Sequence, residues 1–225
     1  MSRGESTLTV TSYAILGLLA IQPWTTYELA QQMQRGLRHF WPRAQSRIYE
    51  EPKRLVTEGL ARASAEFTGQ RQSTIYTITP KGRRRLARWL GEPGAGPQLE
   101  FESLVKVWLS EHGTKSDVVS HIAAIKAWAD AQTEENIGFA RNYLATGGPF
   151  PERLAQIILV GRFLNDFGDM VGAWAEWAEG VVKTWPDDPR NARPDFATLE
   201  AVASRTPPTT ASSPGSPLSG RRSRR

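Results

Sequence analysis

The sequence predicts a mainly α-helical chain with one small β-hairpin, arranged as two domains. Three observations lead to this prediction: apolar residues recur at helical spacing over most of the chain, two short runs of strand-forming residues flank the polar segment 68–72, and a Gly- and Pro-rich segment ends at residue 97. Residues 1–97 carry 14 basic and 7 acidic side chains, whereas residues 98–185 carry 7 and 12. This contrast predicts that only the first part contacts a polyanion.

The first domain, residues 1–91, is predicted to run helix, helix, helix, hairpin, helix. Apolar spacing and boundary residues place the four helices at 9–21, 26–37, 45–58 and 81–90. Thr25 and Glu28 fit a capping box, and Pro80 fits a first helical turn. The hairpin is expected to pair 60–67 with 73–79. Pro52 falls inside the expected third helix, where it should remove one backbone hydrogen bond and kink the helix.

After a linker at 92–97, residues 98–185 are predicted to be all helical. From 151 to 185, apolar and small residues step alternately by three and four, as in a coiled-coil seam. Such a helix would be about 50 Å long, more than one small domain covers. We therefore predict that a second copy packs along this seam, with Gly161, Gly168 and Ala175 allowing close approach. The tail, 186–225, is predicted to be disordered by composition.

Helix, helix, helix, hairpin, helix is the order of a winged helix-turn-helix, which presents its third helix to the DNA major groove and its hairpin, the wing, to the backbone. Residues 12–90 also contain YAILGLL, TYEL, IY-x-x-P-K-R-L-x-x-x-G-L and Y-x-I-T-x-K-G-R. With these motifs the chain resembles the PadR family of transcriptional regulators. The resemblance implies a homodimer, assembled through 98–185, that binds double-stranded operator DNA and represses transcription.

The candidate DNA contacts fall into three groups. At the start of the predicted third helix, short polar and guanidinium groups could reach base edges or phosphates, and the resemblance adds a tyrosine there: Gln45, Ser46, Arg47 and Tyr49. Basic residues that flank this helix or occupy the wing suit phosphate: Arg43, Lys53, Arg54 and Arg71. The Tyr27 hydroxyl could also donate to a phosphate. For two of these residues a structural role is the alternative to DNA contact. Tyr49 could be half-buried in the core, and Arg54 could pair with Glu50 or Glu58 on its own helix.

The resemblance further implies a small aromatic effector bound near the dimer interface. The aromatic residues of the helical domain that could form such a pocket are Trp108, Trp128, Phe163, Phe167 and Trp174. The alternative is that these side chains only pack in the core and the dimer.

Several function classes are disfavoured. The chain has no Cys and only three His, without metal-ligand spacing, so we expect no enzyme activity, no cofactor and no metal. The apolar run 13–21 is too short to span a membrane, and the protein is expected to be cytoplasmic and associated with the nucleoid. Two alternatives to a PadR-like regulator remain: a winged-helix adaptor that binds proteins, and a MarR-type regulator. The Arg-rich segment 81–90 and the basic wing favour DNA binding over the adaptor.

Overall fold

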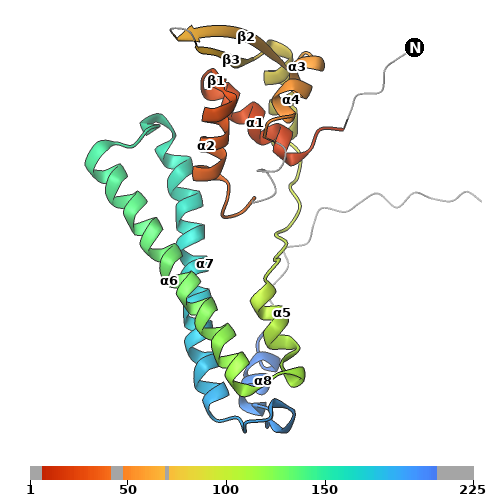
Figure 1. Cartoon of the computed structure of the whole chain (residues 1–225), viewed down its shortest axis with the longest axis vertical. Helices are drawn as coiled ribbons and strands as arrows, with labels where there is room; N and C mark the ends of the chain where they lie inside the picture. The colour runs from red at the N-terminus through yellow and green to blue at the C-terminus, as the bar shows by residue number, and fades with distance from the viewer. Residues whose placement is uncertain (1–6, 42–47, 69–70, 207–225) are drawn as a thin grey trace, which may run out of the picture. The chain divides into compact units, whose positions relative to one another are not determined.

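The computed structural model describes residues 7–41, 48–68 and 71–206. The chain divides into two compact units, Met1–Leu99 and Glu100–Arg225, which are described separately (Figure 1). The boundary falls in a stretch, residues 93–101, that has neither helix nor strand.

The first unit contains four helices and a three-stranded antiparallel sheet. Its elements are α1 (Val10–Ile21), β1 (Trp24–Thr25), α2 (Thr26–Gly36), α3 (Glu51–Thr57), β2 (Ala61–Thr68), β3 (Arg71–Ile78) and α4 (Pro80–Leu90). The sheet order is β1-β3-β2. The predicted order of helices and hairpin is confirmed, but β1 was not predicted. It is only two residues long, and its pairing with Tyr76 and Ile75 of β3 depends on tertiary contact.

Side-chain caps fix where two of these helices begin. In the predicted capping box, the Thr25 hydroxyl accepts from the Glu28 amide at 3.2 Å, and a Glu28 carboxylate oxygen accepts from the Thr25 amide at 2.8 Å. At α4, Thr79 accepts from the Gly82 amide at 3.0 Å, with Pro80 in the first turn. Both predicted helix starts are therefore confirmed.

The core of the first unit forms between the helices and the sheet. Its largest fully buried apolar side chains come from α1, α2 and α3: Ile15, Leu16, Leu19, Leu29, Met33 and Leu55. Tyr13 of α1 stacks on Trp89 of α4 with ring centroids 4.5 Å apart. Position 82 requires glycine, because α4 passes close to the end of the hairpin there. An added Cβ would clash with the Leu60 backbone carbonyl and lie 2.8 Å from Ile78 Cγ1.

The third helix differs from its prediction. Residues 48–50 form a turn and α3 begins at Glu51, while 42–47 lie outside the described residues. Pro52 therefore lies in the first helical turn, where its missing N–H has no intrahelical acceptor to lose, and the predicted kink is wrong. Gly59, at φ 69°, ends the helix: Leu60 N donates to Leu55 O at 2.8 Å and Gly59 N to Val56 O at 2.9 Å.

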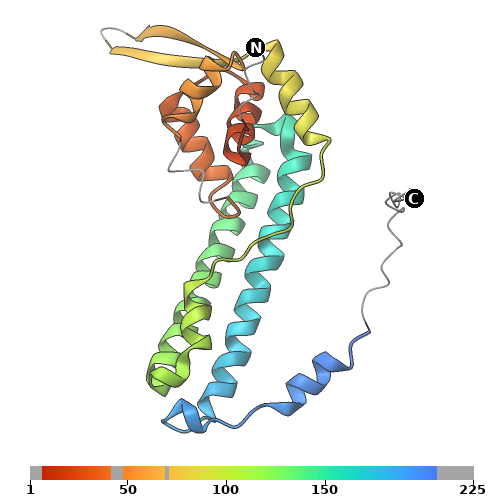
Figure 2. The ribbon, with the colours of Figure 1, turned by 90° about the vertical axis from the view of Figure 1, so that its right-hand side faces the viewer.

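The second unit is all helical in its described residues. It comprises α5 (Glu102–Trp108), η2 (Ser110–His112), α6 (Lys115–Thr146), η3 (Pro151–Arg153), α7 (Leu154–Lys183), η4 (Pro189–Asn191) and α8 (Phe196–Ala203). The two long helices, α6 and α7, form an antiparallel hairpin (Figure 2). Gly147 and Gly148, at φ 77° and 66°, make the turn between them. Among the described residues, no helix is long and apolar enough to cross a membrane.

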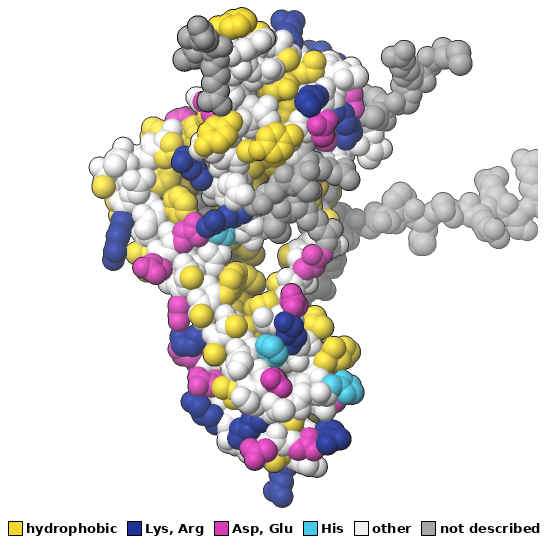
Figure 3. Space-filling view, in the orientation of Figure 1, with side chains coloured by type: hydrophobic (Ala, Val, Ile, Leu, Met, Phe, Trp, Pro, Cys, Tyr) yellow, Lys and Arg dark blue, Asp and Glu magenta, His cyan; other side chains and the backbone are white. Residues whose placement is uncertain are grey.

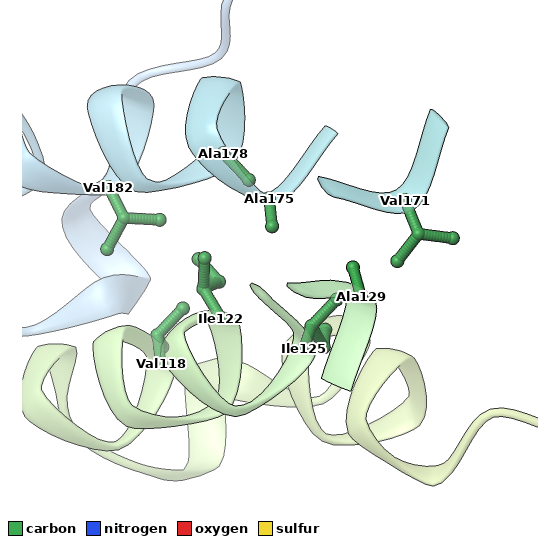
Figure 4. Close-up of a cluster of buried hydrophobic side chains, with 8 residues drawn as sticks. All are labelled: Val118, Ile122, Ile125, Ala129, Val171, Ala175, Ala178 and Val182. Atoms are coloured by element: carbon green, nitrogen blue, oxygen red, sulfur yellow. The ribbon is translucent and has the colours of Figure 1, made fainter. Parts of the chain in front are cut away.

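The seam predicted on 151–185 does not face a second copy over its C-terminal half. There, small and apolar side chains of α7 pack on α6 of the same chain: Val171, Ala175, Ala178 and Val182 against Val118, Ile122, Ile125 and Ala129 (Figure 4). A Cβ added at Gly168 would lie 3.3 Å from the Thr133 hydroxyl oxygen of α6, so the two helices also approach closely at this position. The heptad-like spacing was correct, but its partner is the preceding helix, because a tight turn makes that helix the nearest apolar surface.

The prediction of a disordered 186–225 tail is also wrong in part. Within its described portion, α8 begins at the N-cap Asp195, whose carboxylate accepts from the Thr198 amide at 3.1 Å. Phe196, Leu199 and Val202 follow at helical spacing. Composition averaged over the whole tail hid this short capped segment, since Pro, Ser and Arg dominate the residues around it.

We expect Gly82→Ala to lower the free energy of unfolding by about 2 kcal/mol, because the new Cβ would force α4 away from the hairpin. Gly17→Ala is the matched control: it lies inside α1, an added Cβ there meets nothing within 4 Å, and it should raise stability by about 0.5–1 kcal/mol. Urea denaturation measures both. Equal effects of the two substitutions would contradict the close approach of α4.

Candidate nucleic-acid interface

The turn before α3 buries the side chain of Ile48 and exposes that of Tyr49. Ile48 is 4% exposed and anchors the turn in the core, whereas Tyr49 is 60% exposed. Tyr49 is therefore not half-buried in the core, and its ring and hydroxyl are accessible at the N-terminal end of α3. A tyrosine in this position can contact a base edge or donate to a phosphate.

Tyr27, in the first turn of α2, is 67% exposed. Its hydroxyl oxygen accepts a hydrogen bond from Gln31 Nε2 at 3.0 Å, one helical turn later. Because the oxygen is the acceptor in that bond, the hydroxyl proton remains available to a phosphate oxygen. Gln31 thereby orients the Tyr27 side chain.

Two basic residues of α3 have different environments. Lys53 pairs with Glu50 at 3.1 Å, with both side chains well exposed, and such a surface pair contributes little stability. A phosphate could therefore replace Glu50 as the partner of Lys53. Arg54 is directed inward: it contacts the Glu51 carboxylate at 3.2 Å and the Glu58 carboxylate at 3.1 Å, and donates to the Thr7 carbonyl at 2.9 Å.

These contacts favour the alternative in which Arg54 pairs on its own helix, although with Glu51 as well as Glu58. Sequence reasoning missed Glu51, which is 3% exposed and also accepts a hydrogen bond from the Ser12 hydroxyl of α1. The Glu51 carboxylate thus joins α1 to the start of α3. One signal was available in the sequence: Arg54 lies one turn after Glu51 and one turn before Glu58.

Other predicted contacts cannot be placed. Arg43, Gln45, Ser46 and Arg47 lie outside the described residues. Arg71 occupies the first position of β3, opposite Thr68, but its side chain is not among those described. On the wing, sequence reasoning named only Arg71 and missed Phe67, which is 67% exposed on β2.

The predicted effector residues of the second unit come together only in part. Trp128 of α6 lies 6.1 Å from Phe167 of α7, which stacks on Phe163 at 6.5 Å. The ring of Phe101, which was not predicted, also lies 6.1 Å from that of Trp128. We call Phe101, Trp128, Phe163 and Phe167 the aromatic row. The row reaches the surface, since Trp128 is 42% and Phe163 60% exposed.

Two of the predicted effector residues are not in the aromatic row. Trp108 is 80% exposed, and Trp174 packs against the core between α6 and α7. Among the described residues of both units, no group of His, Asp and Glu side chains could hold a metal ion.

Four helices and a three-stranded sheet with a long β2–β3 hairpin define the first unit as a winged-helix domain. Residues 15–88 match the model of the transcriptional regulator PadR-like family. Residues 15–88 are therefore a PadR-like domain. The family motifs have structural roles here: Thr79 and Gly82 of ITPKGR cap α4 and let it approach the hairpin.

Two curated relatives support the assignment. The chain is 29% identical over 126 residues to the probable transcriptional regulator Rv1176c of Mycobacterium tuberculosis, covering 51% of this chain and 67% of that protein. It is 34% identical over 82 residues to the negative transcriptional regulator PadR of Bacillus subtilis, covering 36% of this chain and 45% of that protein. The chain thus matches less than half the length of the Bacillus relative.

Solved structures share the fold over most of the chain. Bacillus subtilis PadR in complex with operator DNA gives a TM-score of 0.67 at 22% identity, covering 77% of this chain and 99% of that one. PadR in complex with p-coumaric acid gives 0.59 at 21% identity, covering 77% and 96%. The Vibrio cholerae virulence activator AphA gives 0.52 at 19% identity, covering 85% and 99%. At these identities the likeness is one of fold.

We expect Glu51→Ala to lower the free energy of unfolding by about 3 kcal/mol, because it leaves Arg54 without its most buried partner and removes the hydrogen bond between Ser12 of α1 and the start of α3. Glu50→Ala is the matched control on the neighbouring residue. It removes only the exposed pair with Lys53 and should cost less than about 1 kcal/mol. Chemical denaturation of the two variants separates these values, and a similar small cost for both would mean that the buried network contributes little.

Proposed function

We propose that this protein is a transcriptional regulator that binds operator DNA, with α3 in the major groove and the wing at the adjacent backbone. One observation carries the proposal: a PadR-like domain exposes Tyr49 at the N-terminal end of α3, where a winged helix reads bases. Bacillus subtilis PadR, which shares the fold, has been crystallised with operator DNA. The excess of basic over acidic side chains in residues 1–97 supports attraction to phosphate.

We further propose that the regulator is a homodimer assembled through residues 98–185. The far part of the α6–α7 hairpin, near its turn, exposes large apolar side chains: Leu144 at 89%, Leu159 at 75%, Phe163 at 60% and Ile158 at 59%. Apolar side chains are visible between charged ones on the surface of the molecule (Figure 3). Apolar surface of this extent at one end of a helical hairpin favours a protein partner. A second copy is the partner that a two-fold operator requires.

We propose repression as the direction of regulation, because the Bacillus relative is a negative regulator. AphA, a virulence activator, has the same fold, so the fold alone does not fix the direction. Direction depends on where the operator lies relative to the promoter. As a DNA-binding protein it would act at the nucleoid, in the cytoplasm.

The aromatic row is our proposed effector site. Its four rings offer stacking surface at the side of the α6–α7 hairpin, and Bacillus subtilis PadR has been crystallised with p-coumaric acid, a small aromatic acid. Trp108 and Trp174, predicted from the sequence alone, are left out of this site. An effector bound there would act by changing the distance between the two α3 helices of the dimer.

DNA binding is tested by fluorescence-anisotropy titration against the duplex upstream of the protein's own gene and a shuffled duplex of the same composition. We expect tight binding to the first duplex only, weakening steeply with salt. Arg47→Ala and Tyr49→Ala should each weaken binding about tenfold or more, whereas Arg141→Ala, an exposed arginine of α6, should not. Adding p-coumaric acid should weaken binding, and Trp128→Ala should remove that response.

Equal weak binding to both duplexes, or none, would favour the alternative in which the winged helix is an adaptor that binds protein partners. That alternative also predicts no effect of Arg47→Ala on whatever DNA binding remains.

Dimerisation is tested by sedimentation equilibrium of the full chain. A protein with a 25.0 kDa chain should sediment at twice that mass. Leu144→Glu together with Leu159→Glu should shift it to the mass of one chain, because charges would be buried in the interface. Glu substitution of Leu90, which is 68% exposed on α4, is the matched control and should leave the dimer intact. A wild-type protein at the mass of one chain would contradict the proposal.

A further inference from the structure

Exposed aromatic side chains lie on three elements of the winged-helix unit. Among the described residues of that unit, three aromatic side chains are more than half exposed: Tyr27 in α2 at 67%, Tyr49 in the turn before α3 at 60%, and Phe67 in the wing at 67%. These are the elements that a winged helix brings to DNA. The two tyrosines carry hydroxyls that can donate to phosphate. Phe67 has no polar side-chain atom, so its exposed ring gains no hydrogen bond from solvent or from phosphate.

The register of the wing defines which face Phe67 occupies. Phe67 pairs with Gln72, two positions along β2 from the Ala65–Thr74 pair. Side chains alternate between the faces of a strand, so Phe67 shares its face with Ala61, which is 2% exposed against the helices. Phe67 therefore lies on the helix side of the sheet, but beyond the end of the helical core.

The chemistry of Phe67 selects one part of the duplex. Phosphates offer charge and base edges offer hydrogen-bond groups, neither of which a phenyl ring can satisfy. Deoxyribose rings are the apolar surface of the backbone, and they line the minor groove that a wing approaches. We propose that Phe67 packs against deoxyribose at the minor-groove edge and supplies an apolar, salt-independent part of the affinity. This inference rests on the proposed function.

Salt dependence distinguishes an apolar contact from an ionic one. The slope of log K against log salt is proportional to the number of phosphates that the protein neutralises. A contact with sugar neutralises none and therefore does not change this slope. Phe67→Ala should therefore weaken binding about tenfold at every salt concentration, with the slope of log K against log salt unchanged. Arg71→Ala should instead lower that slope by roughly one unit. Because sugars carry no sequence information, Phe67→Ala should weaken binding to the upstream duplex and to the shuffled duplex by the same factor.

The experiment is anisotropy titration of the full chain on both duplexes at several salt concentrations. Phe67→Leu keeps an apolar side chain and should retain most of the affinity. Phe196→Ala is the matched control: it removes a phenyl group of similar exposure, 63%, from α8 in the second unit, and should change nothing. A circular-dichroism melt should show equal midpoints for wild type and Phe67→Ala, because the side chain is exposed.

Three results would overturn the inference. If wild type binds DNA and Phe67→Ala binds equally well, Phe67 makes no DNA contact, while the proposed function stands. If Phe67→Ala changes the sedimenting mass of the protein without DNA, the side chain packs on a second copy instead. If wild type binds neither duplex, this inference fails together with the proposed function.

Discussion

The buried carboxylate of Glu51 is the interaction that joins α3 to α1 in the winged helix, and the proposed DNA-binding surface depends on it. It accepts from the Ser12 hydroxyl of α1 and from Arg54, which in turn contacts Glu58 and the Thr7 carbonyl. A charge with 3% exposure is tolerated only when it is paired and hydrogen-bonded. These bonds are directional, unlike apolar contacts, so they fix how α3 is oriented on α1. That orientation determines where Tyr49 lies.

Close approach of small residues governs the rest of the fold in the same way. Gly82 lets α4 approach the carbonyl of Leu60, which fixes the base of the wing. In the second unit, Ala175 and Ala178 let α7 pack against Ile122 and Ile125 of α6. Because the small residues face inward, the large apolar residues of the hairpin turn remain outside, where we propose a second copy binds. Packing within one chain thus decides which surface is available to another.

In the proposed regulator, affinity for DNA would divide between two kinds of contact. Of the two cations of α3, Arg54 is engaged inward, whereas Lys53, in an exposed pair with Glu50, can exchange that partner for a phosphate. Exposed aromatic side chains occur on α2, before α3 and on the wing. Aromatic groups combine apolar area with low conformational entropy, so they bind well without the salt sensitivity of lysine and arginine.

The sequence by itself determined the order of the helices and the hairpin in the first unit and the starts of α2 and α4, because the capping box of Thr25 with Glu28 and the position of Pro80 are local properties. It also indicated Tyr27 and Tyr49 as exposed candidates. Tertiary structure alone decided the partner of the α7 seam, the inward direction of Arg54, the addition of β1 and the place of Phe101 in the aromatic row. Periodicity shows which face of an element is apolar, but the surface that covers it depends on how the chain turns back on itself.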